Sequence, residues 1–154
     1  MIIKMDRSCK ILCIVIGILL FILCIQTIRE NLLPYDPKID DLKRRLALVH
    51  EKSNKLQFYH DKKSYTINKK KVYLCIKDEN GVYYDDNMLI YASLHELGHV
   101  LCDEIGHTPK YWSIFDNLLD KASKTIDPIT NKPVYDPSKP VNRDYCESTY
   151  HNSD

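Results

Sequence analysis

Two histidines four positions apart, His95 and His99, enclose a glutamate, Glu96. On a helix, residues i and i+4 share a face about 5 to 6 Å apart at Cβ, so both imidazoles can reach a single metal ion. Neutral imidazole binds zinc at roughly 2.0 to 2.1 Å without cancelling its charge, so the ion can acidify a bound water to a pKa near about 7. Glu96 lies about 100° further round the helix, outside the ligand set but near that water, where a carboxylate can act as a general base. The spacing therefore indicates a hydrolytic Zn2+ centre.

The helix expected around this pattern is apolar on nearly all sides, which predicts that it is buried. Burying two imidazoles and a carboxylate in such a helix costs several kcal/mol unless something pairs with them, and a metal with its water would satisfy all three. Two alternatives stay open, a zinc site that serves only stability and a chance occurrence of the pattern. The apolar flanks are Leu89, Leu97, Val100 and Leu101.

A third ligand has to come from beyond the two histidines, and three residues are candidates: Asp103, Glu104 and His107. If the helix continues, Glu104 points about 140° away from His99, and Asp103 would place three ligands almost in a line. Gly106 can supply the left-handed conformation that ends a helix and turns the chain back. His107 is therefore the preferred third ligand, with the two acids as rivals.

The motif and the turn that follows it resemble the minimal zinc metallopeptidases of the WLM and SprT-like group. The matching stretches are residues 95–99 (His-Glu-Leu-Gly-His) and 106–112 (Gly-His-Thr-Pro-Lys-Tyr-Trp). The resemblance covers roughly residues 60–122 and departs from the metzincin pattern, which would place a ligand at Ile105.

The resemblance implies that His95, His99 and His107 hold zinc and that Glu96 is the catalytic residue. It also implies a peptidase that acts on proteins or peptides, in which an edge strand of a small sheet aligns the substrate backbone. The alternative reading of that sheet is that it only covers the core. The implied fold is α+β, a small zincin-like core of helix, short antiparallel sheet, zinc helix and supporting helix.

Helix signals support this order of elements. Asp36 reads as an N-cap and Pro37 as the first residue of a helix that runs to about Leu56, on which His50 is expected to be structural rather than a ligand. The zinc helix begins at Asp85 or Asp86.

A supporting helix begins at residues 108–109, Thr-Pro, with an apolar stripe that would pack against the zinc helix and hold His107 in place. On it, Tyr111 and Asp116 are candidate partners of a ligand imidazole. An oxyanion donor could also come from a tyrosine of the C-terminal tail, namely Tyr135, Tyr145 or Tyr150.

Three short runs between the first helix and the zinc helix have strand character, and they predict a three-stranded antiparallel sheet. The expected strands are residues 64–67, 72–76 and 82–84, joined by turns at 68–70 and 79–81. The second turn contains Asn-Gly, the strongest short hairpin signal.

Residues 11–28 carry no charge and are preceded by Lys4, Arg7 and Lys10. Eighteen such residues span about 27 Å as a helix, enough for a hydrocarbon core. A cleaved signal peptide is the competing interpretation, but no Ala-x-Ala-like site follows, which favours an uncleaved single-pass anchor. Basic residues occur on both sides, so the charge rule leaves both membrane orientations open.

Composition limits the remaining possibilities. A net charge of +1 shows none of the basic excess of nucleic-acid-binding domains, so no nucleic-acid partner is expected. Three cysteines lie beyond the anchor, at positions 75, 102 and 146, and this odd number shows no disulfide framework. The expected organisation is a basic flank at 1–10, a transmembrane anchor at 11–28, a linker at 29–37, a metallopeptidase-like domain at 38–124 and a Pro-rich tail at 125–154.

These inferences combine into one expectation: a membrane-anchored zinc metallopeptidase that hydrolyses peptide bonds through a water activated by Glu96. The alternatives are a catalytically inactive membrane-tethered interaction module with a structural zinc site, and a membrane-anchored structural protein in which the motif is accidental.

Overall fold

The computed structural model describes residues 7–32, 36–141 and 145–147. Some residues named in the sequence-based expectations lie outside these ranges, namely Lys4, linker residues 33–35 and Tyr150. The chain divides into two compact units, residues 1–34 and residues 35–154.

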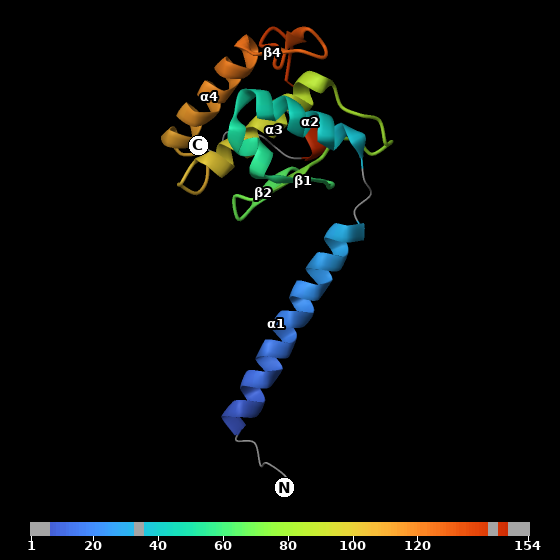
Figure 1. Cartoon of the computed structure of the whole chain (residues 1–154), viewed down its shortest axis with the longest axis vertical. Helices are drawn as coiled ribbons and strands as arrows, with labels where there is room; N and C mark the ends of the chain where they lie inside the picture. The colour runs from blue at the N-terminus through green and yellow to red at the C-terminus, as the bar shows by residue number, and fades with distance from the viewer. Residues whose placement is uncertain (1–6, 33–35, 142–144, 148–154) are drawn as a thin grey trace. The chain divides into compact units, whose positions relative to one another are not determined.

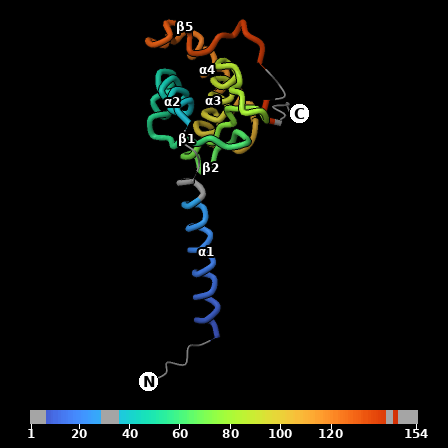
Figure 2. Tube along the Cα trace, turned by 90° about the vertical axis from the view of Figure 1, so that its right-hand side faces the viewer, coloured from blue at the N-terminus to red at the C-terminus, as the bar shows by residue number. Residues whose placement is uncertain are grey.

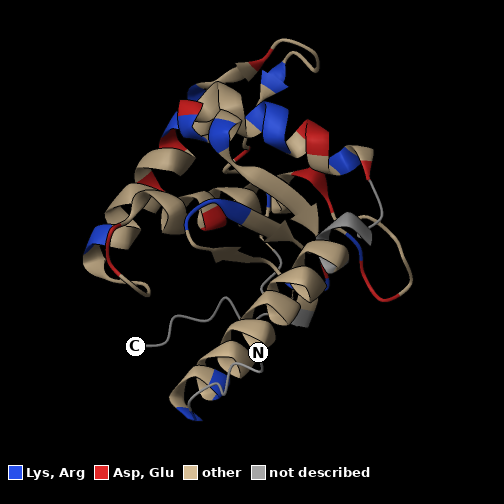
Figure 3. Cartoon of the chain, turned by 60° about the horizontal axis from the view of Figure 1, so that its bottom comes forward, with Lys and Arg blue, Asp and Glu red and all other residues tan. Residues whose placement is uncertain are grey.

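The described part of the first unit is a single helix, α1 (Arg7–Leu32). Its stretch Arg7–Ile28 has a mean hydropathy of 3.0, and none of its most apolar window is buried. Arg7 and Lys10 lie at its N-terminal end, where Figure 3 shows blue, and the coloured part of the helix beyond them is free of charged residues. The helix is long and apolar enough to cross a membrane, a property that an N-terminal signal sequence shares.

The second unit is α+β, as the sequence predicts, with helices over one face of a small sheet (Figure 1). Its main elements are α2 (Pro37–Val49), β1 (Gln57–His60), β2 (Tyr65–Ile67), β3 (Lys71–Leu74), α3 (Asp86–Leu101) and α4 (Pro109–Lys124). Helix α3 is buried along most of its length and packs against both α4 and the sheet.

Helix α2 begins as expected but ends early. The Asp36 side chain accepts a hydrogen bond from the Lys38 amide at 3.0 Å, and Pro37 is the first helical residue. The expected end near Leu56 is wrong, because His50 is extended and a short 3-10 helix, η1 (Glu51–Lys55), follows it. The His50 Nδ1 atom accepts from the Lys52 amide at 3.1 Å, so this histidine has the structural role expected of it.

The prediction of an all-antiparallel sheet is wrong, because the third strand is β1, which runs parallel to its neighbour, and not the segment 82–84. The order is β1-β3-β2, with β3 antiparallel to β2 but parallel to β1. Residues 82–84 do not join the sheet, and Tyr83 forms only an isolated bridge with Lys77. The segment 61–64 carries the chain from β1 to β2 past the position that β3 fills, a distance of about 10 Å that four extended residues can span. Between β2 and β3, Asn68 and Lys69 have φ angles of 51° and 53°, the tight turn that the sequence predicts.

Side-chain alternation gives the sheet two different faces. Tyr59, Tyr73 and Tyr65 stack across the three strands, with ring centroids 5.1 and 4.6 Å apart. Their neighbours Thr66 and Val72 therefore point to the opposite face, where α3 lies.

The segment after α4 returns over the domain (Figure 2) and is held there by polar contacts. It contains a small hairpin of β4 (Ile126–Asp127) and β5 (Lys132–Pro133). Arg44 donates two hydrogen bonds to the buried Asp127 carboxylate, at 2.8 and 2.9 Å, and lowers the pKa of that group. Arg45 donates to the Val134 carbonyl at 3.0 Å.

Two cysteines form a disulfide that the sequence analysis did not anticipate. Cys75, after β3, is bonded to Cys146 in the short 3-10 helix η2 (Tyr145–Glu147), 71 positions away. An odd number of cysteines could not reveal this pair, because the tertiary fold brings the two together. Tyr145 beside it is fully buried, and its hydroxyl donates to the Cys75 carbonyl.

Candidate metal centre

Helix α3 brings His95 and His99 together inside the core. The helix begins where the Asp85 side chain accepts from the Asn87 amide at 2.9 Å. Its i, i+4 geometry places the two Nε2 atoms 3.3 Å apart. His95 is only 5% exposed, and His99 is half-buried.

His107 reaches the same point from the loop after α3. The helix ends at Leu101, earlier than the turn at Gly106 on which the sequence argument relied. Gly106 nevertheless has a φ of 84°, in the left-handed region that favours glycine. The His107 Nε2 atom lies 3.1 Å from that of His95.

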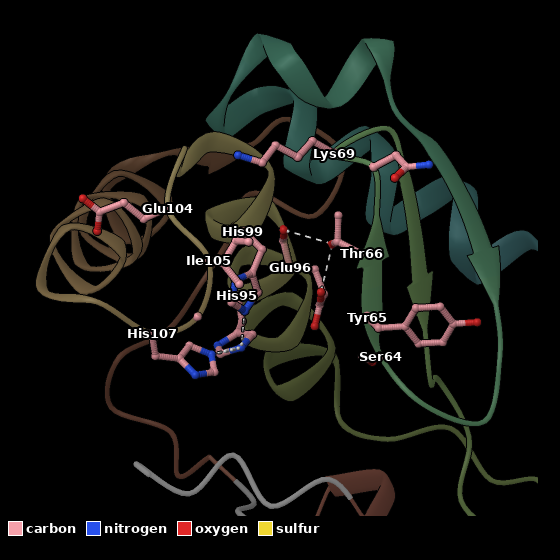
Figure 4. A pocket seen from close by; sticks show the side chains of 12 residues that line it. Ser64, Tyr65, Thr66, Lys69, His95, Glu96, His99, Glu104, Ile105 and His107 are labelled. Carbon is pink, nitrogen blue, oxygen red and sulfur yellow. Dashed lines mark hydrogen bonds between the residues drawn. The ribbon is translucent and has the colours of Figure 1, made fainter. Parts of the chain in front are cut away.

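The three imidazoles thus form a group that could hold a metal ion, since their ligand atoms all lie within 4.8 Å of one another. Figure 4 shows the rings converging from α3 and the loop. Among the described residues, His95, His99 and His107 are the only such group of three or more His, Cys, Asp or Glu side chains.

The rival acidic ligands are engaged elsewhere. Asp103 forms an ion pair with Lys110 at 2.6 Å. Glu104 accepts a hydrogen bond from the Thr108 hydroxyl, and its side chain points away from the histidines (Figure 4). Thr108 is also the N-cap of α4, where its side chain accepts from the Tyr111 amide at 3.3 Å.

Aromatic side chains of α4 pack around the histidines. The Tyr111 ring stacks on His99 with centroids 4.4 Å apart, and its hydroxyl donates to the His95 carbonyl at 3.1 Å. Tyr111 therefore contacts the histidines through its ring and through a hydrogen bond to the main chain. A Cβ atom at Gly98 would lie 3.0 Å from this ring, so the glycine between the ligands lets α4 approach.

Two further residues of α4 differ from Tyr111 in their surroundings. Trp112 stacks on His107, with centroids 5.4 Å apart and the ring planes inclined by 27°. Asp116, the other candidate partner of an imidazole, is exposed to solvent.

The surroundings keep the imidazoles neutral. Burial, with smaller contributions from the nearby imidazoles of His99 and His107, lowers the pKa of His95 to about 3. Burial and His107 lower the pKa of His99 to about 4, and burial lowers that of His107. Neutral imidazole is the form that binds metals, so the group is ready for an ion at physiological pH.

Glu96 is the most deeply buried acid near the group, at 3% exposure. Burial raises the pKa of its carboxyl from 4.5 to about 7, while a hydrogen bond from Thr66 acts in the opposite direction. The Thr66 Oγ1 atom lies 2.9 Å from Glu96 Oε2. Thr66 was not among the predicted site residues; strand alternation could have placed it on the helix-facing side of the sheet, but not opposite Glu96.

These groups line one cavity of about 520 Å³ between β2, α3 and the loop (Figure 4). Its lining comprises Ser64, Tyr65, Thr66, Asn68, Lys69, His95, Glu96, His99, Glu104, Ile105, Gly106 and His107. Ile105 is 97% exposed at its rim. The arrangement places three histidines that could hold a metal ion next to a buried carboxyl group, beside the edge strand of a sheet.

Comparisons with known proteins find similar sequences in viruses. The chain is 51% identical over 89 residues to an uncharacterized protein of Invertebrate iridescent virus 6, covering 56% of this chain and 46% of that protein. It is 44% identical over 94 residues to one of Invertebrate iridescent virus 3, covering 60% and 55% of the two chains. A third, from Acanthamoeba polyphaga mimivirus, is 33% identical over 102 residues, covering 60% and 48%.

The chain thus spans about half the length of the curated relatives it matches. No protein-family model matches the chain. No solved structure matches it either.

Proposed function

We propose that this protein is a membrane-anchored zinc metallopeptidase that hydrolyses peptide bonds. The observation that carries the proposal is the convergence of three neutral imidazoles with the buried Glu96 carboxyl at one open cavity. The types and spacing of these residues are those of the zinc peptidases that the sequence resembles.

Each residue has a role in this proposal. His95, His99 and His107 hold the zinc ion, which when bound supplies acidification of water and polarisation of a peptide carbonyl. Glu96 accepts a proton from the attacking water and passes it to the leaving amine. Burial raises the pKa of this carboxyl group toward the working pH, and catalysis by proton transfer is most effective when the two lie close together.

The ligand count favours catalysis over a structural site. Structural zinc sites have four protein ligands, whereas catalytic sites have three and an open position. The described residues offer three ligand side chains in one group, and the cavity gives solvent and substrate access to it.

The cavity is also suited to an extended chain. Strand β2 lies at the edge of the sheet and forms one wall, with the histidine group opposite. A substrate backbone lying along this edge would pass between strand and metal, by the addition of a strand to a sheet.

The proposal is tested with the full-length chain in detergent, loaded with one equivalent of zinc and incubated with an unfolded protein substrate. Glu96→Gln should keep the metal and lose cleavage, because it removes the base but no ligand. Glu104→Gln is the matched control, since Glu104 lines the same cavity but contacts Thr108, and it should cleave normally. Equal cleavage by wild type and Glu96→Gln would rule out the mechanism.

We further propose that α1 is an uncleaved anchor and that the domain lies on the oxidising side of the membrane. The Cys75–Cys146 disulfide supports this orientation, because disulfides persist in oxidising compartments.

Thiol counting tests the orientation. The denatured chain purified from its native membrane should take up four maleimide labels before reduction, on Cys9, Cys13, Cys24 and Cys102, and six after reduction. Six labels without reduction would place the domain in a reducing compartment.

A further inference from the structure

The buried Glu96 carboxyl group makes a side-chain hydrogen bond to the opposite wall of the cavity. Thr66 Oγ1 donates to Glu96 Oε2 at 2.9 Å, and the same hydroxyl lies 3.3 Å from the Glu96 backbone carbonyl oxygen. One strand residue thus spans from the sheet to both the side chain and the main chain of the glutamate (Figure 4).

Thr66 is itself held firmly. Its neighbour Tyr65 stacks on Tyr73 and donates from its hydroxyl to Asp61 at 2.7 Å, which fixes the face that β2 turns toward α3. Threonine is also branched at Cβ, so its χ1 angle has few alternatives. Glu96, in contrast, has three side-chain torsions that would otherwise be free to turn the carboxyl away.

The hydrogen bond distinguishes the two carboxyl oxygens. Oε2 is engaged by Thr66, so Oε1 is the oxygen left to take and return a proton. General base catalysis requires such an oxygen to stay within hydrogen-bond reach of the water, at about 2.6 to 3.2 Å. A displacement of about 1 Å can cost roughly a hundredfold in rate.

We propose that Thr66 is a positioning residue of this site: its hydroxyl, presented by the edge strand β2, holds the Glu96 carboxyl in the rotamer that directs Oε1 toward the histidine group. The inference rests on the proposed peptidase function. It makes β2 part of the machinery that aligns the base, in addition to being a wall of the cavity.

A merely structural role for Thr66 makes a different prediction. If the hydroxyl only satisfied a buried oxygen, its loss would lower stability and leave turnover by the folded enzyme unchanged. Thr66→Val preserves the shape and the branched Cβ but removes the donor, and Thr66→Ser preserves the donor.

The kinetic experiment uses the zinc-loaded, full-length chain in detergent. Thr66→Val should lower kcat about tenfold to a hundredfold, with KM and zinc affinity within about twofold of wild type, because no ligand is touched. Thr66→Ser should recover most of the lost kcat. Thr125→Val, which removes a hydroxyl bonded to the Lys121 carbonyl on α4, is the control and should turn over normally.

Unchanged kcat in Thr66→Val, or no recovery in Thr66→Ser, would overturn the role of Thr66 while wild type and Glu96→Gln still differ. Absence of cleavage by wild type would overturn the proposed function and this role with it.

A second readout needs no metal and no activity. In excess chelator, Thr66→Val should lower the melting temperature by about 4 °C when Glu96 is present. In a Glu96→Ala background the same substitution should have a smaller effect, because the carboxylate partner is gone and only the 3.3 Å contact to the backbone carbonyl remains. Equal shifts in both backgrounds would show that the two side chains are not coupled and would overturn the assignment.

Discussion

The histidines on α3 and the histidine of the following loop are held in opposite ways. His95 is buried within the helix packing, and Tyr111 bonds to its carbonyl and stacks on His99. His107 is exposed, follows a left-handed glycine and has ring contacts with Tyr111 and Trp112. The helix therefore supplies two ligands at a spacing set by its own geometry, whereas the third depends on the conformation of a loop. Substitutions of the helical histidines (the helical side) and of the loop histidine (the loop side) should therefore differ in how strongly they lower zinc affinity.

The largest effect is expected on the helical side. His99→Ala should lower zinc affinity by several hundredfold, since structural zinc binding in small peptides is worth roughly 10–16 kcal/mol over four ligands, or about 3 to 4 kcal/mol for a well-held one. Competition with a chromogenic chelator measures the loss. His50→Ala serves as the control, because His50 caps η1 and is not a member of the histidine group. If His99→Ala lost less zinc affinity than His107→Ala, the helix would not be the stronger source of ligands.

Glu96, on α3, makes the stability of the fold depend on pH. Its pKa in the folded protein, about 7, lies above the ordinary 4.5, so the folded state keeps a proton that the unfolded chain loses. The difference in pKa adds to the free energy of unfolding below pH 4.5, and this contribution is lost as the pH rises to 7.

In excess chelator at pH 8, Glu96→Gln should therefore be more stable than wild type by on the order of 3 kcal/mol, with little difference at pH 4. Urea unfolding at several pH values measures it. The histidine protonations occur in both proteins and largely cancel in the difference. A gap that stays constant with pH would contradict the buried state of the carboxyl.

On the loop side, His107→Ala should lower zinc affinity by about a hundredfold and abolish cleavage, less than His99→Ala because water can replace a ligand at an exposed position. Asp103→Ala and Glu104→Ala are the controls and should bind zinc normally. Full zinc occupancy in His107→Ala together with loss of the metal in one of the acid variants would move the third ligand to that acid.

The smallest effect should come from the aromatic cover of the loop histidine. Trp112→Ala should weaken zinc binding about tenfold, the low end for residues that orient a ligand from behind. Ile114→Ala, a half-buried neighbour on the same helix, is the control for general loss of packing. Equal affinities of the two variants would show that stacking on His107 does not matter.

The same contrast separates what could be predicted from what could not. The i, i+4 spacing of His95 and His99 is a property of the helix itself, and capping residues such as Asp36 and Thr108 act on their own neighbours. These features depend on a few adjacent residues, so the sequence was enough to predict them. The convergence of His107 with the helix pair was also expected, although the helix end that was invoked for it lies elsewhere.

The features that sequence reasoning missed depend on residues far apart in the chain. Strand β1 lies beside β3, not beside the strand that follows it, and a sequence gives no direct sign of such a pairing. The Cys75–Cys146 bond and the contact of Thr66 with Glu96 join positions 71 and 30 residues apart. Each required the packing of the sheet against α3 and the return of the C-terminal segment.

X-ray absorption at the zinc edge tests the central claim, a catalytic three-histidine site, most directly. The full-length chain in detergent, loaded with one equivalent of zinc, should show only nitrogen and oxygen neighbours at roughly 2.0 to 2.2 Å. The outer-shell scattering should correspond to three imidazole rings, and the fourth neighbour should be a water oxygen. Cys102 is a free thiol on the same helix end, and its participation would appear as sulfur at about 2.3 Å. A sulfur shell, four protein ligands, or failure of the chain to bind zinc would contradict the account.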